Sequence, residues 1–411
     1  MKNLGIKISL YLNYFVFAIL LNSVGAVILQ VQRNYEVTKS MASILEGFKD
    51  LPIAIASFIL ASFLPKFGYK NSMMLGLLLV ALACFIMPVV ADGFWYFKIL
   101  FFIIGVSFAL IKVTVYATIG LITNGTKQHS SFMSSLEGLF MVGVLFGNVL
   151  FSLFIDDNNP KSTYWLNVYW ILGGLSTLAF VFMFFTKLDE SSAKKEGRPL
   201  SEDFMAMIKL IVLPLVLVFI GSIFLFVLIE QSFQTWTPTF YESILKVPAS
   251  MSIQAGAVLA GAFAIGRFGA GFVLKYVHWF KVVFFCLIGT ALMVILSLPL
   301  SKGLSITENI SWFNAPLVVY VFPLMGIFLA PIYPAINSVI LSALPKHLHS
   351  SMSGLIVVFS ALGGTTGSIV TGHVFENCDG QTAFYMSLIP MALMLLMLWL
   401  FKNLRSRFVS N

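Results

Sequence analysis

The sequence predicts an all-α polytopic membrane protein with twelve transmembrane helices. Of its 411 residues, 59% are hydrophobic and only 10% are charged, whereas a soluble domain is about 25% charged. The mean hydropathy is +0.95, and the apolar residues fall into runs of the ~20 residues that a spanning helix needs. This composition excludes a soluble enzyme, a disordered chain and a small disulfide-rich domain.

The expected helices follow one another with short connections. The first is not typical of a cleavable signal peptide, because it is long, contains Asn13 and Asn22, and lacks a small-residue cleavage site. We expect the twelve spans at residues 8–30, 42–64, 72–91, 95–123, 131–155, 164–186, 207–231, 251–274, 281–299, 314–342, 350–373 and 383–401.

The longest polar connection divides the chain into two halves. Residues 187–206 are rich in charged and polar side chains, with six expected spans on each side. We therefore expect an N-terminal six-helix half at 1–186, a cytoplasmic linker at 187–206 and a C-terminal six-helix half at 207–411.

The distribution of Lys and Arg indicates the orientation. With both termini in the cytoplasm, sixteen of these residues fall on the inside and six on the outside. Lys and Arg are enriched in cytoplasmic loops. We therefore expect an integral protein of a plasma membrane or bacterial inner membrane, surrounded by the lipid bilayer, with both termini cytoplasmic.

The two halves share a short repeat. A His-Ser-Ser triplet opens the fifth expected span and, 220 residues later, the eleventh, and two glycines four residues apart follow each triplet. These glycines are Gly143 and Gly147 in the first half, and Gly363 and Gly367 in the second. Small residues at this spacing allow membrane helices to approach closely, so we expect a structural role for them.

This arrangement resembles the major facilitator superfamily, in which a cytoplasmic linker joins two six-helix halves. The family carries a signature rich in glycine and charged residues between its second and third spans. Residues 61–70 (ASFLPKFGYK) keep its second glycine and basic residues, but Pro65 occupies the acidic position. The corresponding segment at 271–281 has Lys275 at that position. The resemblance implies two parallel six-helix repeats and transport by alternating access, without the usual charge relay at this loop.

A narrower resemblance is to the fucose–galactose–proton symporter branch of that family. Residues 226–241 contain a similar Glu…Trp…Tyr pattern, which includes Glu230 and Trp236. We place Trp236 among the candidate substrate-binding residues and Glu230 among the candidate gating residues. The branch usually has a carboxylate in its fourth span, where this sequence has Lys112, so its proton and sugar chemistry does not carry over at that position.

Ionisable side chains inside the membrane are the strongest candidates for function, because a central charge costs about 2.5–3.5 kcal/mol to insert. Glu46, Lys49 and Asp50 in the second span share one helical face by their spacing. They either line the cavity as a proton-coupling or gating cluster, or form a self-neutralising group at the water interface.

Lys112 lies deep in the fourth span, between Phe108 and Tyr116 on the same helical face. It is too far from either end of the helix for its ammonium to reach water easily along the surface. We expect Lys112 and Tyr116 to bind a polar or anionic substrate. The alternative is a structural ion pair between Lys112 and a carboxylate on a neighbouring helix.

Three further charged residues occupy later spans. Glu137 shares a face of the fifth span with Asn148 and is the leading candidate for proton coupling, with a pairing to Lys112 as the alternative. Glu230, beside Gln231 near the end of the seventh span, is either a gate or sugar contact, or a merely interfacial group. Arg267 in the eighth span is expected to be a structural charge.

Two amides complete the candidate site. Asn22 lies in the first span, and Asn337 follows Pro331 and Pro334 in the tenth, where the prolines interrupt helical hydrogen bonding. Together with Gln231, we expect these amides on the cavity wall as substrate-binding residues. Ordinary hydrogen bonds between helices are the alternative.

The sequence therefore predicts a secondary active transporter for a sugar-like or small polar or anionic solute, with H⁺ as the coupling ion. The alternative is a non-transporting membrane sensor or assembly partner on the same fold. The sequence has no Walker loop, dinucleotide fingerprint or His/Cys metal spacing. We therefore expect a monomer without enzymatic activity, cofactor, metal or nucleic-acid partner.

Overall fold

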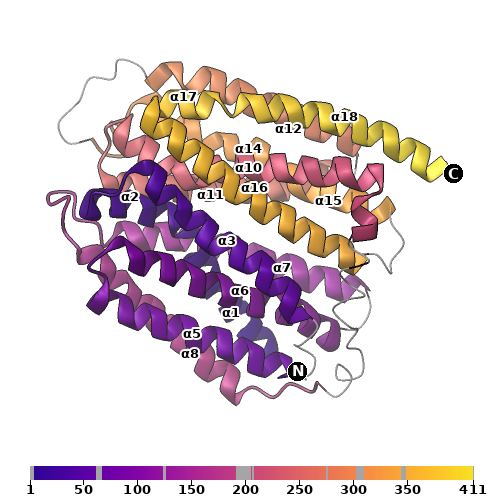
Figure 1. Ribbon diagram of the computed structural model, residues 1–411, viewed down its shortest axis with the longest axis horizontal. Helices are drawn as coiled ribbons and strands as arrows, with labels where there is room; N and C mark the ends of the chain where they lie inside the picture. Colours follow the sequence, from indigo (N-terminus) through magenta and orange to yellow (C-terminus); the bar gives the residue numbers. More distant parts are fainter. Residues whose placement is uncertain are drawn as a thin grey trace.

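The computed structural model describes residues 4–61, 67–123, 126–190, 205, 208–274, 276–301, 310–343 and 349–410. Throughout these ranges the regular structure is helical, which confirms the predicted fold class. Both termini lie toward the same end of the helix bundle, at the right of Figure 1. We call this the terminal end and the opposite end the distal end.

The described helices account for all twelve expected spans. The first half contains α1 (Leu4–Asn22), α2 (Val24–Tyr35), α3 (Lys39–Ala61), α5 (Tyr69–Val90), α6 (Phe94–Ile122), α7 (Thr126–Ser152), η1 (Tyr164–Asn167) and α8 (Val168–Phe185). The second half contains α10 (Pro214–Ser243), α11 (Ala249–Val273), α12 (Trp279–Ser297), η3 (Pro299–Ser301), α13 (Leu317–Val321), η4 (Phe322–Leu324), α14 (Met325–Leu329), α15 (Ile332–Ala343), α16 (His349–Asn377), α17 (Gly380–Tyr385) and α18 (Leu388–Ser410).

Eleven helical segments of the described part are long and apolar enough to cross a membrane. The helix α3 is not among them, because Glu46, Lys49 and Asp50 interrupt its apolar run. It nevertheless packs along its length between α6 and α16. We therefore count α3 as the second of the twelve predicted spans.

The tenth and first spans are interrupted away from their ends. The tenth span is divided into α13, η4, α14 and α15, with Pro323, Pro331 and Pro334 along it, as predicted for the last two. The first span is divided at Ser23, which the sequence did not predict. The Ser23 hydroxyl donates to the carbonyl of Leu20 at 2.8 Å, and such bonds from a side chain to the preceding turn bend helices.

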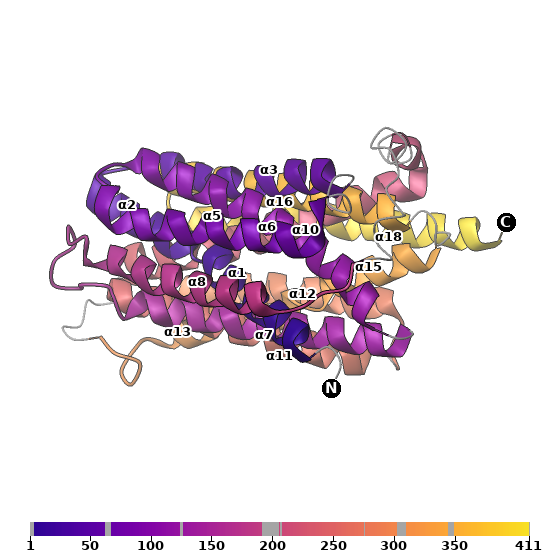
Figure 2. The same ribbon diagram turned by 90° about the horizontal axis from the view of Figure 1, so that it is seen from below.

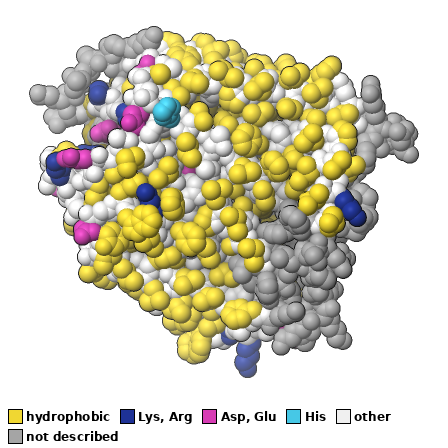
Figure 3. Space-filling view, viewed as in Figure 1, with side chains coloured by type: hydrophobic (Ala, Val, Ile, Leu, Met, Phe, Trp, Pro, Cys, Tyr) yellow, Lys and Arg dark blue, Asp and Glu magenta, His cyan; other side chains and the backbone are white. Residues whose placement is uncertain are grey.

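The two halves lie side by side, with the first below the second in Figure 1. Along the seam, α3 packs against α16 and α7 packs against α11, while α2 packs against α10. Figure 2 shows that the long helices run broadly parallel to the long axis of the bundle. The face seen in Figure 3 is mainly hydrophobic, with most of its charged side chains gathered toward the distal end.

The repeated glycines hold equivalent helix pairs together. A Cβ added to Gly367 in α16 would overlap the backbone oxygen of Leu228 in α10. A Cβ added to Gly147 in α7 would lie 3.2 Å from the Cα of Ile19 in α1. The other glycine of each pair packs against the same neighbouring helix, so their predicted structural role is confirmed.

At the terminal end, α5 and α8 cap each other. Glu190, at the start of the linker, accepts hydrogen bonds from the backbone N–H groups of Tyr69 and Lys70 at 3.0 and 2.7 Å. Lys70 Nζ in turn donates to the carbonyl oxygens of Phe184 and Thr186 at 2.8 and 2.7 Å. Each charge lies at the helix end whose dipole attracts it. The carboxylate of Glu190 therefore lies beside Tyr69 and Lys70, at the end of the signature segment 61–70. The sequence of that segment itself lacks the acid of the family signature.

Candidate functional site

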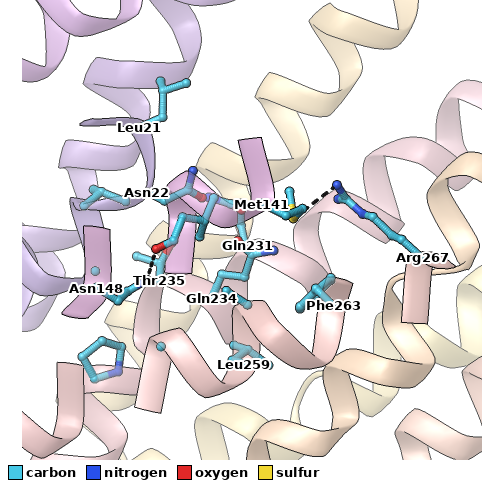
Figure 4. Close-up of a pocket in the computed structure, with 16 residues that line it drawn as sticks. Leu21, Asn22, Met141, Asn148, Gln231, Gln234, Thr235, Leu259, Phe263 and Arg267 are labelled. Atoms are coloured by element: carbon cyan, nitrogen blue, oxygen red, sulfur yellow. Dashed lines mark hydrogen bonds between the residues drawn. The ribbon is translucent and has the colours of Figure 1, made fainter. Parts of the chain in front are cut away.

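A small pocket lies on the seam between the two halves (Figure 4). It is bounded by the α1–α2 break and α7 in the first half, and by α10 and α11 in the second. Its polar lining consists of four amides, a hydroxyl and a guanidinium, from Asn22, Asn148, Gln231, Gln234, Thr235 and Arg267. A molecule held here would therefore contact hydrogen-bonding groups from both halves.

Two of the pocket amides hold equivalent positions in the repeat. Asn22 follows Ile19 by three residues, and Ile19 packs against the second glycine of the first pair. Gln231 likewise follows Leu228 by three residues, and Leu228 packs against the second glycine of the second pair. The same helix-pair geometry therefore presents one amide to the pocket from each half.

The pocket is nearly closed in this conformation. Its free volume is about 40 Å³, and one water molecule needs ~10–15 Å³ of such space. The pocket can hold a few water molecules but no sugar-sized solute. A solute could bind here only after the two halves move apart.

Hydrogen bonds join the two halves on the distal side of this pocket. Asp157 accepts hydrogen bonds from the backbone N–H of Ser250 at 3.0 Å and from its hydroxyl. Glu376 in α16 accepts a hydrogen bond from the backbone N–H of Ser40 in α3 at 2.7 Å. These hydrogen bonds join the end of a loop or helix in the first half to the end of a helix in the second. The distal end is therefore closed in this conformation.

The cation at the edge of the pocket, Arg267, forms an ion pair with Glu230. Arg267 Nη2 lies 3.8 Å from Glu230 Oε1. Arg267 Nη1 lies 3.6 Å from the sulfur of Met141 across the seam, a contact that Figure 4 marks with a dashed line. The Glu230 side chain is 12% exposed and that of Arg267 is 32% exposed. This ion pair is consistent with the structural role expected for Arg267, and it places Glu230 inside the protein rather than at an interface.

Lys112 lies among aromatic rings. Its Nζ is 5.8 Å from the centroid of the Phe108 ring, and the Phe108 ring lies 6.4 Å from that of Tyr14. Lys112 forms no salt bridge with the carboxylates of the described residues. Its side chain is only partly buried. The described structure therefore offers no direct ion-pair partner for Lys112.

Glu137 is held by a tyrosine from the neighbouring helix. The Tyr116 hydroxyl donates a hydrogen bond to Glu137 Oε1 at 3.1 Å, and Tyr14 packs against Tyr116 with ring centroids 6.4 Å apart. Glu137 precedes Met141 of the pocket wall by one turn of α7. The aromatic cluster around Lys112 and Glu137 therefore adjoins the amide pocket toward the terminal end.

The predicted common face of Glu46, Lys49 and Asp50 is confirmed. Lys49 Nζ contacts Glu46 Oε1 and lies 3.5 Å from Asp50 Oδ1. Glu46 is fully buried, and it accepts hydrogen bonds from Gln231 Nε2 at 2.5 Å and from the Thr235 hydroxyl at 3.1 Å. The cluster lies inside the protein and ties α3 to α10 beside the pocket.

The sequence profile of the major facilitator superfamily matches residues 10–365 of the chain. The chain belongs to the major facilitator superfamily. This assignment makes it a membrane transporter and agrees with the helix arrangement described above. No curated protein matches the chain closely by sequence.

Three solved structures illustrate how far the shared fold extends. A D-xylose–proton symporter aligns with a TM-score of 0.72 at 12% identity, covering 96% of each chain. The E. coli fucose:proton symporter FucP aligns with a TM-score of 0.63 at 15% identity, covering 98% of this chain and 99% of that one. An inward-facing, unoccupied bacterial homologue of the human lysosomal transporter Spinster aligns with a TM-score of 0.72 at 13% identity, covering 98% and 96%.

Two of the residues predicted for the site of this superfamily member lie away from the amide pocket. Trp236 is fully buried between α10 and α16, where its Nε1 donates to the carbonyl of Ser368 at 3.0 Å and its ring stacks on Phe375. Asn337 lies in α15, partly buried, with an unpartnered side-chain oxygen. A direct substrate contact remains a prediction for both.

Other residues of the site were not singled out from the sequence. Thr235 lies one turn of α10 beyond Gln231, so extending that polar face would have found it. Tyr14 lies eight residues before Asn22 and is rotated from it by ~80° around the helix, so spacing alone did not connect the two.

Metal binding has no support in the described structure. In the described ranges, no three His, Cys, Asp or Glu side chains lie close enough together to hold a metal ion. The site of this superfamily member therefore offers hydrogen bonds, aromatic surface and charge, which are groups suited to binding a small solute and a proton.

Proposed function

We propose that this protein is a secondary active transporter that moves a sugar-like or small polar solute by alternating access, coupled to H⁺. The observation that carries the proposal is the pocket on the seam, where the two halves present equivalent amides, Asn22 and Gln231, to the same space. A solute that contacts both halves would be held differently in each state, because the distance between the two amides changes when one half rocks against the other.

The conformation described here fits one end state of such a cycle. The distal end is tied shut by Asp157 with Ser250 and by Ser40 with Glu376. The pocket has collapsed to a few water molecules in volume. We infer that solute reaches or leaves the pocket through the terminal end in this state, and that these distal hydrogen bonds break in the opposite state.

The lining favours a solute with several hydroxyl groups. Amide side chains both donate and accept hydrogen bonds, and Arg267, the cation at the pocket edge, is already paired with Glu230. Lys112, in the adjoining aromatic cluster, has no salt bridge among the described residues and could receive a negative charge. We therefore include neutral sugars and sugar acids as the two leading substrate classes.

Proton coupling is assigned to Glu137. Its carboxylate accepts a hydrogen bond from Tyr116, which lies one turn of α6 beyond Lys112, a candidate contact for the solute. Binding of a proton to Glu137 and of a solute near Lys112 would thereby influence each other. The structural neighbours whose names specify proton symport with xylose or fucose support this proposal by analogy of fold.

The proposal is tested in two stages on the purified protein. Thermal unfolding across a panel of sugars, sugar acids, nucleosides and amino acids should reveal a ligand, because a specific binder raises the melting temperature by mass action. Proteoliposomes should then accumulate that ligand only when a pH gradient is imposed. Accumulation without a gradient dependence would refute H⁺ coupling, and binding without movement would favour a non-transporting role.

A further inference from the structure

A second cavity opens on the membrane-facing surface of the bundle. This groove has a volume of about 570 Å³ and runs between α3, α6 and α16. Its lining is almost wholly apolar and includes Leu51, Ile55, Ile59, Phe102 and Ile369. Each of these side chains is more than a third exposed, so hydrocarbon from the bilayer would contact them directly.

A lysine stands at the distal mouth of the groove. Lys98, one turn into α6, lies over the rings of Phe94, Trp95 and Phe48, with its Nζ 4.9, 5.4 and 5.8 Å from their centroids. Phe48 itself lines the groove, and Lys98 lies one turn before the lining residue Phe102. Lys98 forms no salt bridge with any described carboxylate. The mouth therefore carries a positive charge without a paired anion in the described structure.

The groove is long enough for a lipid chain that descends from the distal leaflet. Its lining on α3 extends from Ile44 to Ile59, which corresponds to about 22 Å of helix at 1.5 Å per residue. One leaflet contributes about 15 Å of hydrocarbon. Thr365, in the inner wall, is nine-tenths buried and its hydroxyl has no hydrogen-bond partner among the described residues.

We propose that this groove binds an anionic membrane phospholipid, with one acyl chain along α3 and the headgroup phosphate at Lys98. The argument is charge complementarity: an apolar channel with a cation that lacks a paired anion at its distal mouth fits an amphiphile with a negative head. The proposal is independent of which solute is transported, because it requires only that the chain spans a bilayer.

The position of the groove gives the bound lipid a consequence for the protein. The lipid would contact α3 and α6 of the first half and α16 of the second. Behind the groove wall, Asp50 packs against the backbone of α16 at Gly364. A lipid that fills the groove would stabilise the seam in its distal-closed state and seal the charged cluster from the bilayer.

Native mass spectrometry of the detergent-purified protein, titrated with phosphatidylglycerol or phosphatidylcholine, tests this site. We expect one phosphatidylglycerol bound more tightly than phosphatidylcholine. Lys98→Gln should weaken phosphatidylglycerol binding about fivefold, the effect of one basic residue near anionic lipid, and should remove the preference. Ala56→Phe should fill the groove and reduce the binding of both lipids.

Two control variants isolate the groove from general lipid adhesion. Lys161→Gln removes an exposed cation at the distal end that pairs with Glu36, and Leu82→Phe enlarges a lipid-facing side chain on α5. Both should bind phosphatidylglycerol like the parent. Equal binding of the two lipids by the parent, or an unchanged preference in Lys98→Gln, would overturn the proposal. A dimer that Ala56→Phe abolishes would assign the groove to a second copy of the chain instead.

Discussion

Lys112 and Lys49 are both lysines deep inside the membrane, but their surroundings differ. Lys49 touches two carboxylates, Glu46 and Asp50, and is almost fully buried. Lys112 is only partly buried, lies over the ring of Phe108 and has no salt bridge in the described structure. A paired buried charge holds a structure together, whereas an unpaired and accessible one is available to a ligand.

This contrast predicts opposite effects of the same substitution. Lys112→Ala should keep the melting temperature of the parent but weaken substrate binding at least tenfold, because no directly paired carboxylate is left without its partner. Lys49→Ala should instead destabilise the fold by about 3–5 kcal/mol, the range for breaking a buried ion pair. Thermal unfolding and ligand binding measured on both variants check the prediction. A Lys112→Ala variant that melts early would show that its charge is structural.

Glu137 is the residue at which coupling should be lost selectively. Glu137→Gln preserves the shape of the side chain and can still accept the hydrogen bond from Tyr116, but an amide cannot exchange a proton. We expect unchanged solute binding and exchange, and loss of uphill accumulation in proteoliposomes under a pH gradient. Asp50→Asn is the comparison. If Asp50→Asn alone abolishes accumulation, the coupling carboxylate lies in the α3 cluster rather than in α7.

At the level of helices, the close contact of α10 with α16 depends on glycine. Gly367→Ala should lower stability by about 1–3 kcal/mol, the typical effect of overpacking, because the new methyl group would meet the backbone of Leu228. Gly261→Ala in α11 is a matched control, since a Cβ there has open space. The control should be neutral or slightly stabilising, because alanine favours a helix by roughly 0.5–1 kcal/mol over glycine. Equal melting temperatures for both variants would contradict the packing argument.

The sequence predicted the helices well because their signals are local. Apolar runs define the spans, prolines interrupt the tenth, and paired glycines mark close packing. The partners of the site residues are not local. Glu46 meets Gln231 across 185 positions, and Glu190 caps α5 from across 120 positions. No spacing rule connects such residues, so the hydrogen bond from Gln231 to Glu46, the unpaired state of Lys112 and the interior position of Trp236 emerged only from the folded arrangement.

At the level of the whole molecule, the distal closure should be one of two alternating states. A disulfide between Asp157→Cys and Ser250→Cys, in a background without the three native cysteines, should hold this end shut. These residues are directly hydrogen-bonded, so little movement is needed for the bond to form. We expect transport in proteoliposomes to stop on oxidation and to return on reduction. Each single-cysteine variant should transport under both conditions, and transport by the oxidised double variant would refute alternation at this seam.

The charged residues inside the bundle also determine how membrane voltage acts on it. Away from their ends, the described helices carry four carboxylates, Glu46, Asp50, Glu137 and Glu230, and three cations, Lys49, Lys112 and Arg267. With all seven ionised, this set has one net negative charge, and a single bound proton cancels it.

The electric field would therefore do work on the proton-free carrier but not on the carrier loaded with one proton and a neutral solute. One elementary charge moved across the full potential corresponds to about 2.3 kcal/mol per 100 mV, an upper limit for charges that stay near the membrane centre. We expect voltage to change the rate at which the empty carrier resets and to leave loaded exchange unaffected, measured in proteoliposomes clamped with a potassium diffusion potential. Voltage-sensitive exchange would show that more than one charge moves with the solute.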